Sequence, residues 1–157
     1  MKFLVVVGPA FVRLSLTLNI VVLIAVCTVL IAFGDSEPVT SVWGPATAAR
    51  GILLSIYFSI LVVSVVLLVL HSHFNDSEQD KVAIEHMVAA LLSTQILYKI
   101  TTPATAGPAN PVAISNLCIS ALHALTLYLL WQKHTTASRI EKEVTTAKSD
   151  CDKQGSE

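Results

Sequence analysis

The chain has 157 residues, of which 54% are hydrophobic and 13% charged, with a formal net charge of −1. A soluble domain usually carries about a quarter charged residues, so this composition excludes an ordinary soluble globular protein. The near-neutral charge gives no sign of a nucleic-acid partner. A bilayer is crossed by roughly 20 helical residues. Four apolar stretches have about that length: Leu14–Phe33, Gly51–Leu70, Val82–Ile100 and Pro111–Trp131.

These stretches leave no soluble domain large enough to carry an activity of its own. We therefore expect an all-α integral membrane protein. Its four-helix transmembrane bundle would occupy residues 1–133, and a charged cytoplasmic tail would occupy residues 134–157.

The N-terminus begins like a secretory signal but does not continue like one. Lys2 is followed by the apolar run Phe3–Val7, which a Gly-Pro pair interrupts after five residues. The apolar core of a secretory signal has about 7–15 residues. The apolar run after Arg13 has full membrane length instead. We expect a short interfacial lead-in and then a first transmembrane helix, with Ser15 and Asn19 on one face.

The second stretch carries small residues at regular spacing. Thr47 is placed to cap its helix. Gly51, Ser55 and Ser59 follow at intervals of four residues. Helices in lipid associate through close backbone contact at such residues rather than through apolar faces. This stripe therefore predicts a helix-packing interface.

The third stretch is the weakest of the four, because only the 12 residues Met87–Tyr98 separate His86 from Lys99. They cover about 18 Å of helix, so a re-entrant or interfacial segment is the alternative. We favour a full crossing, since Lys99 can extend along its apolar stem to one interface while Glu85 lies near the other. An interfacial segment would also place the basic tail on the outer side, against the usual distribution of Lys and Arg.

Polar side chains flank both ends of this third helix. Gln95 and Lys99 share a face near its outer end, with Tyr98 beside them. At its inner end, Glu85 could form an ion pair with Arg13 of the first helix.

Signals for helix starts and interfaces support the same boundaries. Asp76, with Gln79 three residues later, resembles a capping box before the third helix. Asn110-Pro111 is a typical start for the fourth. Trp43 and Trp131 lie where aromatic belts form, at opposite interfaces.

In the fourth stretch, Asn116, Ser120 and His123 lie within about 60° of one another around the helix. His123 should lie near the bilayer midplane, where an ionisable side chain is costly and often functional. The alternative is a neutral histidine that hydrogen-bonds Asn19 or Ser93 on a neighbouring helix. Together, Asn19, Ser93, Asn116, Ser120 and His123 are the candidate ligand site or transport path.

The basic residues predict the orientation, because Lys and Arg are retained on the cytoplasmic side. Four crossings would leave Arg50 and Lys99 on the outer side. The other eight would share the inner side: Lys2, Arg13, Lys81, Lys133, Arg139, Lys142, Lys148 and Lys153. Both termini are then cytoplasmic, and we expect the protein in the plasma (inner) membrane. The tail from Gln132 to Glu157 has too few apolar residues to bury, so a short helix should give way to disorder.

The histidines suggest two further hypotheses. A haem between helices needs two histidines at similar depth. His86 would lie ~10 Å from the midplane and His123 within ~3 Å, with His71 further out, so the depths do not match. His71, His73 and the nearby acids could bind a divalent metal, but a solvated, capped loop also explains the acids. We expect neither metal nor cofactor.

The cysteines and the wider motif search indicate no enzyme. Cys27, Cys118 and Cys151 form no C-x-x-C pair, which removes the usual signature of a thiol oxidoreductase. A buried cysteine commonly behaves as a small hydrophobic residue. No motif typical of a nucleophile, phosphate loop or zinc site is present, so we assign no catalytic residues.

The leading functional hypothesis is therefore an accessory or self-associating membrane component. Its partners would be the lipid bilayer and either a second copy or another membrane protein, with no nucleic acid. The alternative is a small-molecule or ion transporter or channel whose polar path includes His123. A third hypothesis is a haem or quinone redox protein. A water-filled interior would favour transport, whereas a dry one would count against it.

Overall fold

The computed structural model describes residues 2–73 and 77–154, and this part of the chain is helical with no strands. The expectation of an all-α protein is confirmed. The described residues form five helices: α1 Lys2–Ala32, α2 Glu37–Trp43, α3 Ala48–His73, α4 Glu78–Ala106 and α5 Pro111–Gln154.

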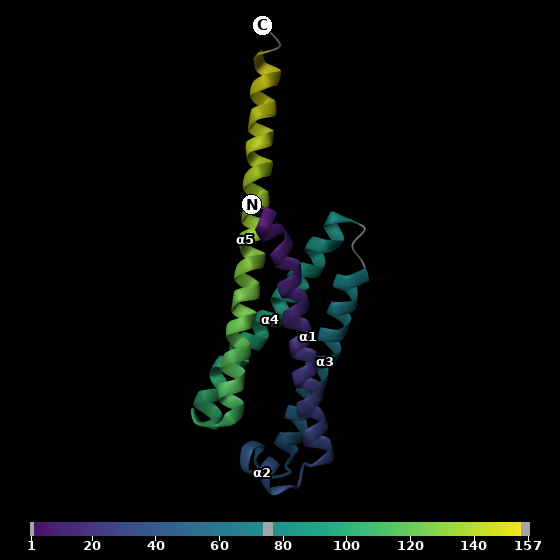
Figure 1. Cartoon of the computed structure of the whole chain (residues 1–157), viewed down its shortest axis with the longest axis vertical. Helices are drawn as coiled ribbons and strands as arrows, with labels where there is room; N and C mark the ends of the chain where they lie inside the picture. The colour runs from purple at the N-terminus through teal and green to yellow at the C-terminus, as the bar shows by residue number, and fades with distance from the viewer. Residues whose placement is uncertain (1, 74–76, 155–157) are drawn as a thin grey trace.

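The four long helices alternate in direction, and the short α2 lies at one end (Figure 1). We call this end, which also holds the α4–α5 turn, the α2 end, and the opposite one the terminal end. Asn110 in the α4–α5 turn donates from Nδ2 to the Val42 carbonyl at 3.2 Å, which ties the turn to α2. The chain thus forms two helical hairpins, α1–α3 and α4–α5, that meet along α1 and α5.

Three helices are long and apolar enough to cross a membrane: Gly8–Ala32, Ala48–His73 and Pro111–Ile140. They correspond to the first, second and fourth predicted crossings. Helix α4 contains the third predicted stretch but does not belong to this group, because Glu85, Gln95 and Lys99 interrupt its apolar sequence.

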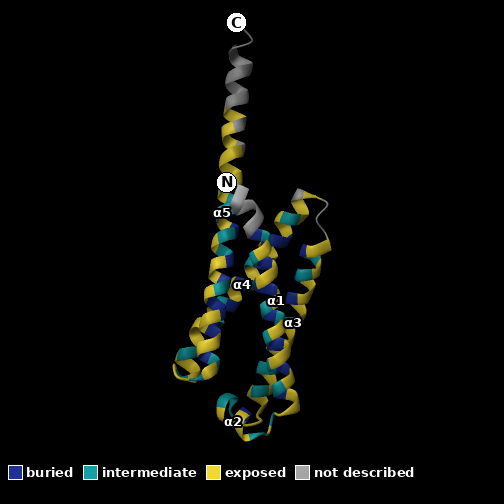
Figure 2. Ribbon diagram, viewed as in Figure 1, coloured by how far each residue is buried: buried dark blue, intermediate teal, exposed yellow. Residues whose placement is uncertain are grey.

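Three polar side chains of helix α4 face inward. Glu85, Gln95 and Lys99 are 4%, 0% and 2% exposed, whereas Met87 and Leu97 lie on its exposed side. Figure 2 shows this arrangement along the whole bundle, with buried residues on the facing sides of the helices. The expectation that Lys99 extends outward to an interface is wrong, because oxygens inside the protein hold its ammonium.

The helix ends follow ordinary capping chemistry. Asn110 accepts a hydrogen bond from the Val112 amide at 2.8 Å, as its position before Pro111 predicts. Helix α4 is capped by Ser77, whose Oγ accepts from the Asp80 amide at 3.1 Å. The expected Asp76–Gln79 box includes Asp76, which lies outside the described residues.

Glycine ends two of these helices at the α2 end. Gly44 follows α2 and Gly107 follows α4, with φ angles of 78° and 92°. This left-handed region costs a side-chain-bearing residue free energy that glycine does not incur.

Two apolar clusters fill the bundle, one near each end. The terminal cluster joins all four long helices and comprises Val12, Leu16, Leu67, Ile84, Val88, Leu92 and Leu130. The cluster at the α2 end comprises Leu23, Cys27, Leu30, Val39 and Tyr57. The second is built from α1, α2 and α3, with Tyr98 of α4 packed against it.

Two differences from expectation concern the N- and C-terminal segments. Helix α1 runs from Lys2 through Pro9 as one helix, without a separate lead-in. Helix α5 continues to Gln154, further than the short helix expected for the tail. Strong helix formers such as Lys142 and Glu143 favour this continuation.

An ion pair joins α4 to α5 at the terminal end. Lys133 donates from Nζ to Glu85 Oε1 at 2.6 Å, and His134 Nε2 lies 3.0 Å from Oε2. The His86 ring stacks on His134 with centroids 5.4 Å apart. The suggested partner Arg13 is exposed on α1, so Lys133 takes its place.

Replacing Lys133 with methionine should destabilise the bundle, because the buried Glu85 carboxylate then loses its closest cation. We expect a loss of about 2 kcal/mol in the free energy of unfolding, less than the ~3–5 kcal/mol of a fully buried pair because water still reaches Lys133. Lys142→Met, at an exposed position on the same helix, is the control. Denaturant titration in detergent micelles measures both, and equal effects of the two substitutions would contradict the assignment.

Candidate functional site

The bundle encloses a series of polar side chains contributed by all four long helices. The buried ones within the expected membrane depth are Ser15, Asn19, Ser64, Gln95, Lys99, Asn116, Ser120, His123 and Thr126. Polar groups in lipid are costly unless they find partners inside the protein. The partners of these residues therefore determine what the interior can do.

His123 is fully buried, and its Nδ1 lies 2.6 Å from Ser15 Oγ on α1. The alternative of a neutral histidine named Asn19 or Ser93 as the partner, and Ser15 takes that place instead. Asn19 instead donates from Nδ2 to Ser64 Oγ on α3 at 2.7 Å. Within the described part of the chain, His123 Nε2 has no hydrogen-bond partner.

Four of the five predicted path residues lie inside the bundle. Asn19, Asn116, Ser120 and His123 are buried, whereas Ser93 lies on the exposed face of α4. The Ser120 hydroxyl donates to the Asn116 carbonyl at 2.8 Å, as is usual for serine in a helix. Asn116 Nδ2 donates to Thr102 Oγ1 on α4 at 3.1 Å. The interior residues thus link neighbouring helices in separate pairs.

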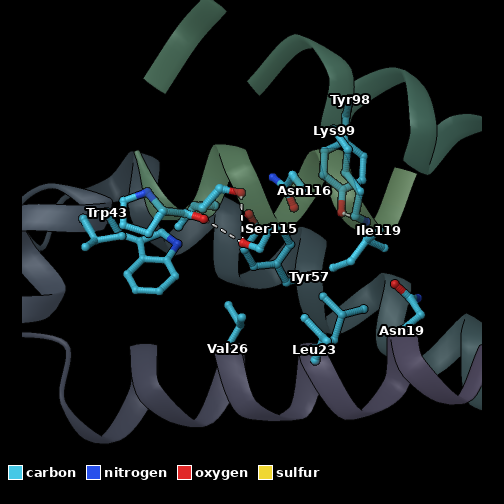
Figure 3. A pocket seen from close by; sticks show the side chains of 14 residues that line it. Asn19, Leu23, Val26, Trp43, Tyr57, Tyr98, Lys99, Ser115, Asn116 and Ile119 are labelled. Atoms are coloured by element: carbon cyan, nitrogen blue, oxygen red, sulfur yellow. Dashed lines mark hydrogen bonds between the residues drawn. The ribbon is translucent and has the colours of Figure 1, made fainter. Parts of the chain in front are cut away.

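A pocket of about 260 Å³ lies at the α2 end, and all five helices contribute to its wall. Its apolar side includes Leu23 and Val26, which point into it from α1 (Figure 3). Its polar and aromatic lining comprises Asn19, Trp43, Tyr57, Tyr98, Lys99, Ser115 and Asn116. Such a mixture of apolar walls and few polar groups is typical of small-molecule sites.

Lys99 is the only ionisable group with a formal charge among the residues that line this pocket. Its ammonium donates to Gln95 Oε1 at 2.8 Å and to the Tyr98 hydroxyl at 2.6 Å, and it lies 4.4 Å from the Tyr98 ring centroid. Both oxygens are neutral. No described carboxylate forms an ion pair with Lys99.

Sequence reasoning named Lys99, Gln95 and Tyr98 as neighbours but missed the pocket. Its remaining wall comes from the other four helices, among them Trp43 of α2 and Tyr57 of α3. Residue spacing within one helix does not indicate which residues of different helices lie next to each other.

The described histidines and other candidate ligands do not form the arrangement that a haem or a metal ion would need. The His123 ring bonds with Ser15 while the His86 ring stacks on His134, so these two histidines do not flank a common space. Within residues 2–73 and 77–154, no three His, Cys, Asp or Glu side chains gather closely enough to hold a metal. Cys27 is buried in an apolar cluster.

The stripe of Gly51, Ser55 and Ser59 faces outward on α3. It lines a shallow groove of about 640 Å³ together with Ile52 and Ile56. The Ser55 and Ser59 hydroxyls donate to the carbonyls four residues earlier, at 3.0 and 2.8 Å. The stripe therefore packs against none of the other described helices and presents a small, hydrogen-bonded surface to its surroundings.

No family model, curated protein or solved structure matches the chain.

Replacing Ser15 with alanine should weaken the bundle, because His123 Nδ1 would lose its partner in a fully buried position. Interhelical hydrogen bonds of this kind contribute about 1 kcal/mol. Ser115→Ala, on the exposed side of α5, removes a hydroxyl bonded only to its own helix and should have little effect. Unfolding in mixed detergent micelles compares the two, and a Ser15→Ala variant as stable as Ser115→Ala would contradict the assigned bond.

Proposed function

We propose that this protein is a non-catalytic, multi-pass membrane protein that binds a small molecule in the pocket at the α2 end. The observation that carries the proposal is a pocket that combines an apolar wall with the buried ammonium of Lys99. A charge in a low-dielectric site costs several kcal/mol unless it is paired. A bound ligand that supplies the missing interactions would offset this cost.

We also propose that α4 crosses the membrane, which gives four crossings with both termini in the cytoplasm. Two features support this topology. Glu85, Gln95 and Lys99 face the interior of the bundle. The outward side of α4 carries Met87, Leu97 and Ile100 together with the short hydroxyl side chains of Ser93 and Thr94, which suits a crossing helix. The α4–α5 turn is tied to α2 through Asn110. The distribution of basic residues then favours a plasma-membrane protein with an inner tail.

The interior favours binding at one end over an open channel. Asn19 and Asn116 line the pocket, whereas Ser120 and His123 do not. Towards the terminal end of the bundle, the terminal apolar cluster joins all four long helices. An ion would have to pass this packed layer, so a transporter of this structure would need a second conformation.

A second candidate function, self-association, is favoured by the outward stripe on α3. Its small residues lie in a groove into which a second helix could pack closely. This is the natural interface for an accessory component that binds a second copy or another membrane protein.

Native mass spectrometry of the protein released from its own membrane tests both functions together. We expect the wild type to retain a non-protein mass, and Val26→Trp to lose it because the larger side chain fills the pocket. Val21→Trp, which adds the same bulk on the exposed face of α1, should retain the mass. A ligand-free wild type, or a mass retained equally by all three proteins, would contradict the proposed pocket.

The same spectra report the number of subunits. If the α3 stripe is the interface, the wild type should be oligomeric, and Ser55→Leu with Ser59→Leu should be monomeric. A wild-type monomer would contradict self-association without affecting the pocket.

A further inference from the structure

We infer that the ligand is a monoanionic amphiphile, a carboxylate attached to one short apolar chain or ring, with its carboxylate bound at Lys99. This inference rests on the proposed ligand-binding function and adds the chemical class of the ligand. It follows from the charge, the free hydrogen-bond donor and the apolar wall of the same pocket.

The charge of the pocket selects an anion. Lys99 is 2% exposed, and the hydrogen bonds of its ammonium go to a neutral amide and a neutral hydroxyl. The buried carboxylate of the bundle, Glu85, is paired with Lys133 at the terminal end. The described carboxylates at the α2 end are both exposed: Asp35 lies beside Arg50 at 3.7 Å and is 94% exposed, and Glu37 lies at the exposed start of α2. Neutralisation inside the pocket therefore has to come from the ligand.

The free donor of Lys99 matches one anionic oxygen. An ammonium has three N–H donors, and the Gln95 and Tyr98 oxygens occupy two of them. The third is left for an oxygen of the ligand, because Lys99 lines the pocket. A dianion such as a phosphate monoester would retain excess negative charge, because the pocket lining has one cation and no arginine.

The apolar walls of the pocket favour a ligand with a single apolar chain or ring. Leu23, Val26 and Ile119 face the pocket with the rings of Trp43 and Tyr57. A volume of about 260 Å³ is at the small end of ligand pockets. This space suits one short chain or ring better than the paired chains of a phospholipid.

Quenching of Trp43 fluorescence can measure binding, because Trp43 lines the pocket and Trp131, the only other tryptophan, does not. The full chain with Trp131→Phe is placed in zwitterionic nanodiscs and titrated with bromo-octanoate, bromo-octanol and bromo-octylamine. We expect saturable quenching by bromo-octanoate that unbrominated octanoate competes away. The alcohol should bind at least about tenfold more weakly, since it lacks a charge-assisted hydrogen bond.

The Lys99→Met variant should lose this preference and bind bromo-octanoate about tenfold or more weakly, while Lys142→Met, at an exposed site on the tail, should match the parent. The bromo-octanol titration shows whether the Lys99→Met pocket is still formed. Equal binding of acid and alcohol, unchanged by Lys99→Met, would overturn the anion assignment but keep the pocket. If none of the three probes binds saturably, the proposed function itself is overturned.

Discussion

The structure depends on one constraint: the polar groups of α4 have to be satisfied inside the bundle. Glu85, Gln95 and Lys99 are nearly inaccessible, and each contacts a group within the protein. In the proposed topology hydrocarbon surrounds α4 and offers no hydrogen bonds, so these contacts determine which side of α4 faces its neighbours. The outward side carries apolar residues such as Leu97 together with the short hydroxyl side chains of Ser93 and Thr94. In this way a helix that is too polar to qualify as a membrane span by composition becomes part of the bundle.

The two ends of α4 meet this constraint differently. At the terminal end, Glu85 forms an ion pair with Lys133 beside the terminal apolar cluster. At the α2 end, Lys99 forms hydrogen bonds only with neutral oxygens, and a pocket lies beside it. The first arrangement is complete within the chain and stabilises the fold. The second leaves an ammonium that an external anion would complement. The stabilising ion pair and the proposed binding site therefore lie at opposite ends of α4.

Much of this arrangement was predictable from spacing within single helices. The cap at Asn110 and the common face of Asn116, Ser120 and His123 follow directly from the order of residues. The outward position of Ser93 could also be predicted, because a residue two positions before the buried Gln95 lies about 160° around the helix from it. The Ser15–His123 bond and the pocket depend on how the helices are rotated and crossed. No single-helix pattern contains that information.

The central claim is that α4 carries its buried charges across the membrane. Labelling with a membrane-impermeant maleimide tests it in intact cells, using a cysteine-free chain with single cysteines at the exposed positions Glu37, Ala109 and Ser138. The proposed topology predicts that positions 37 and 109 react from outside, and that position 138 reacts only after the membrane is opened. Positions 37 and 109 on opposite sides would mean that α4 does not cross, and would contradict the account.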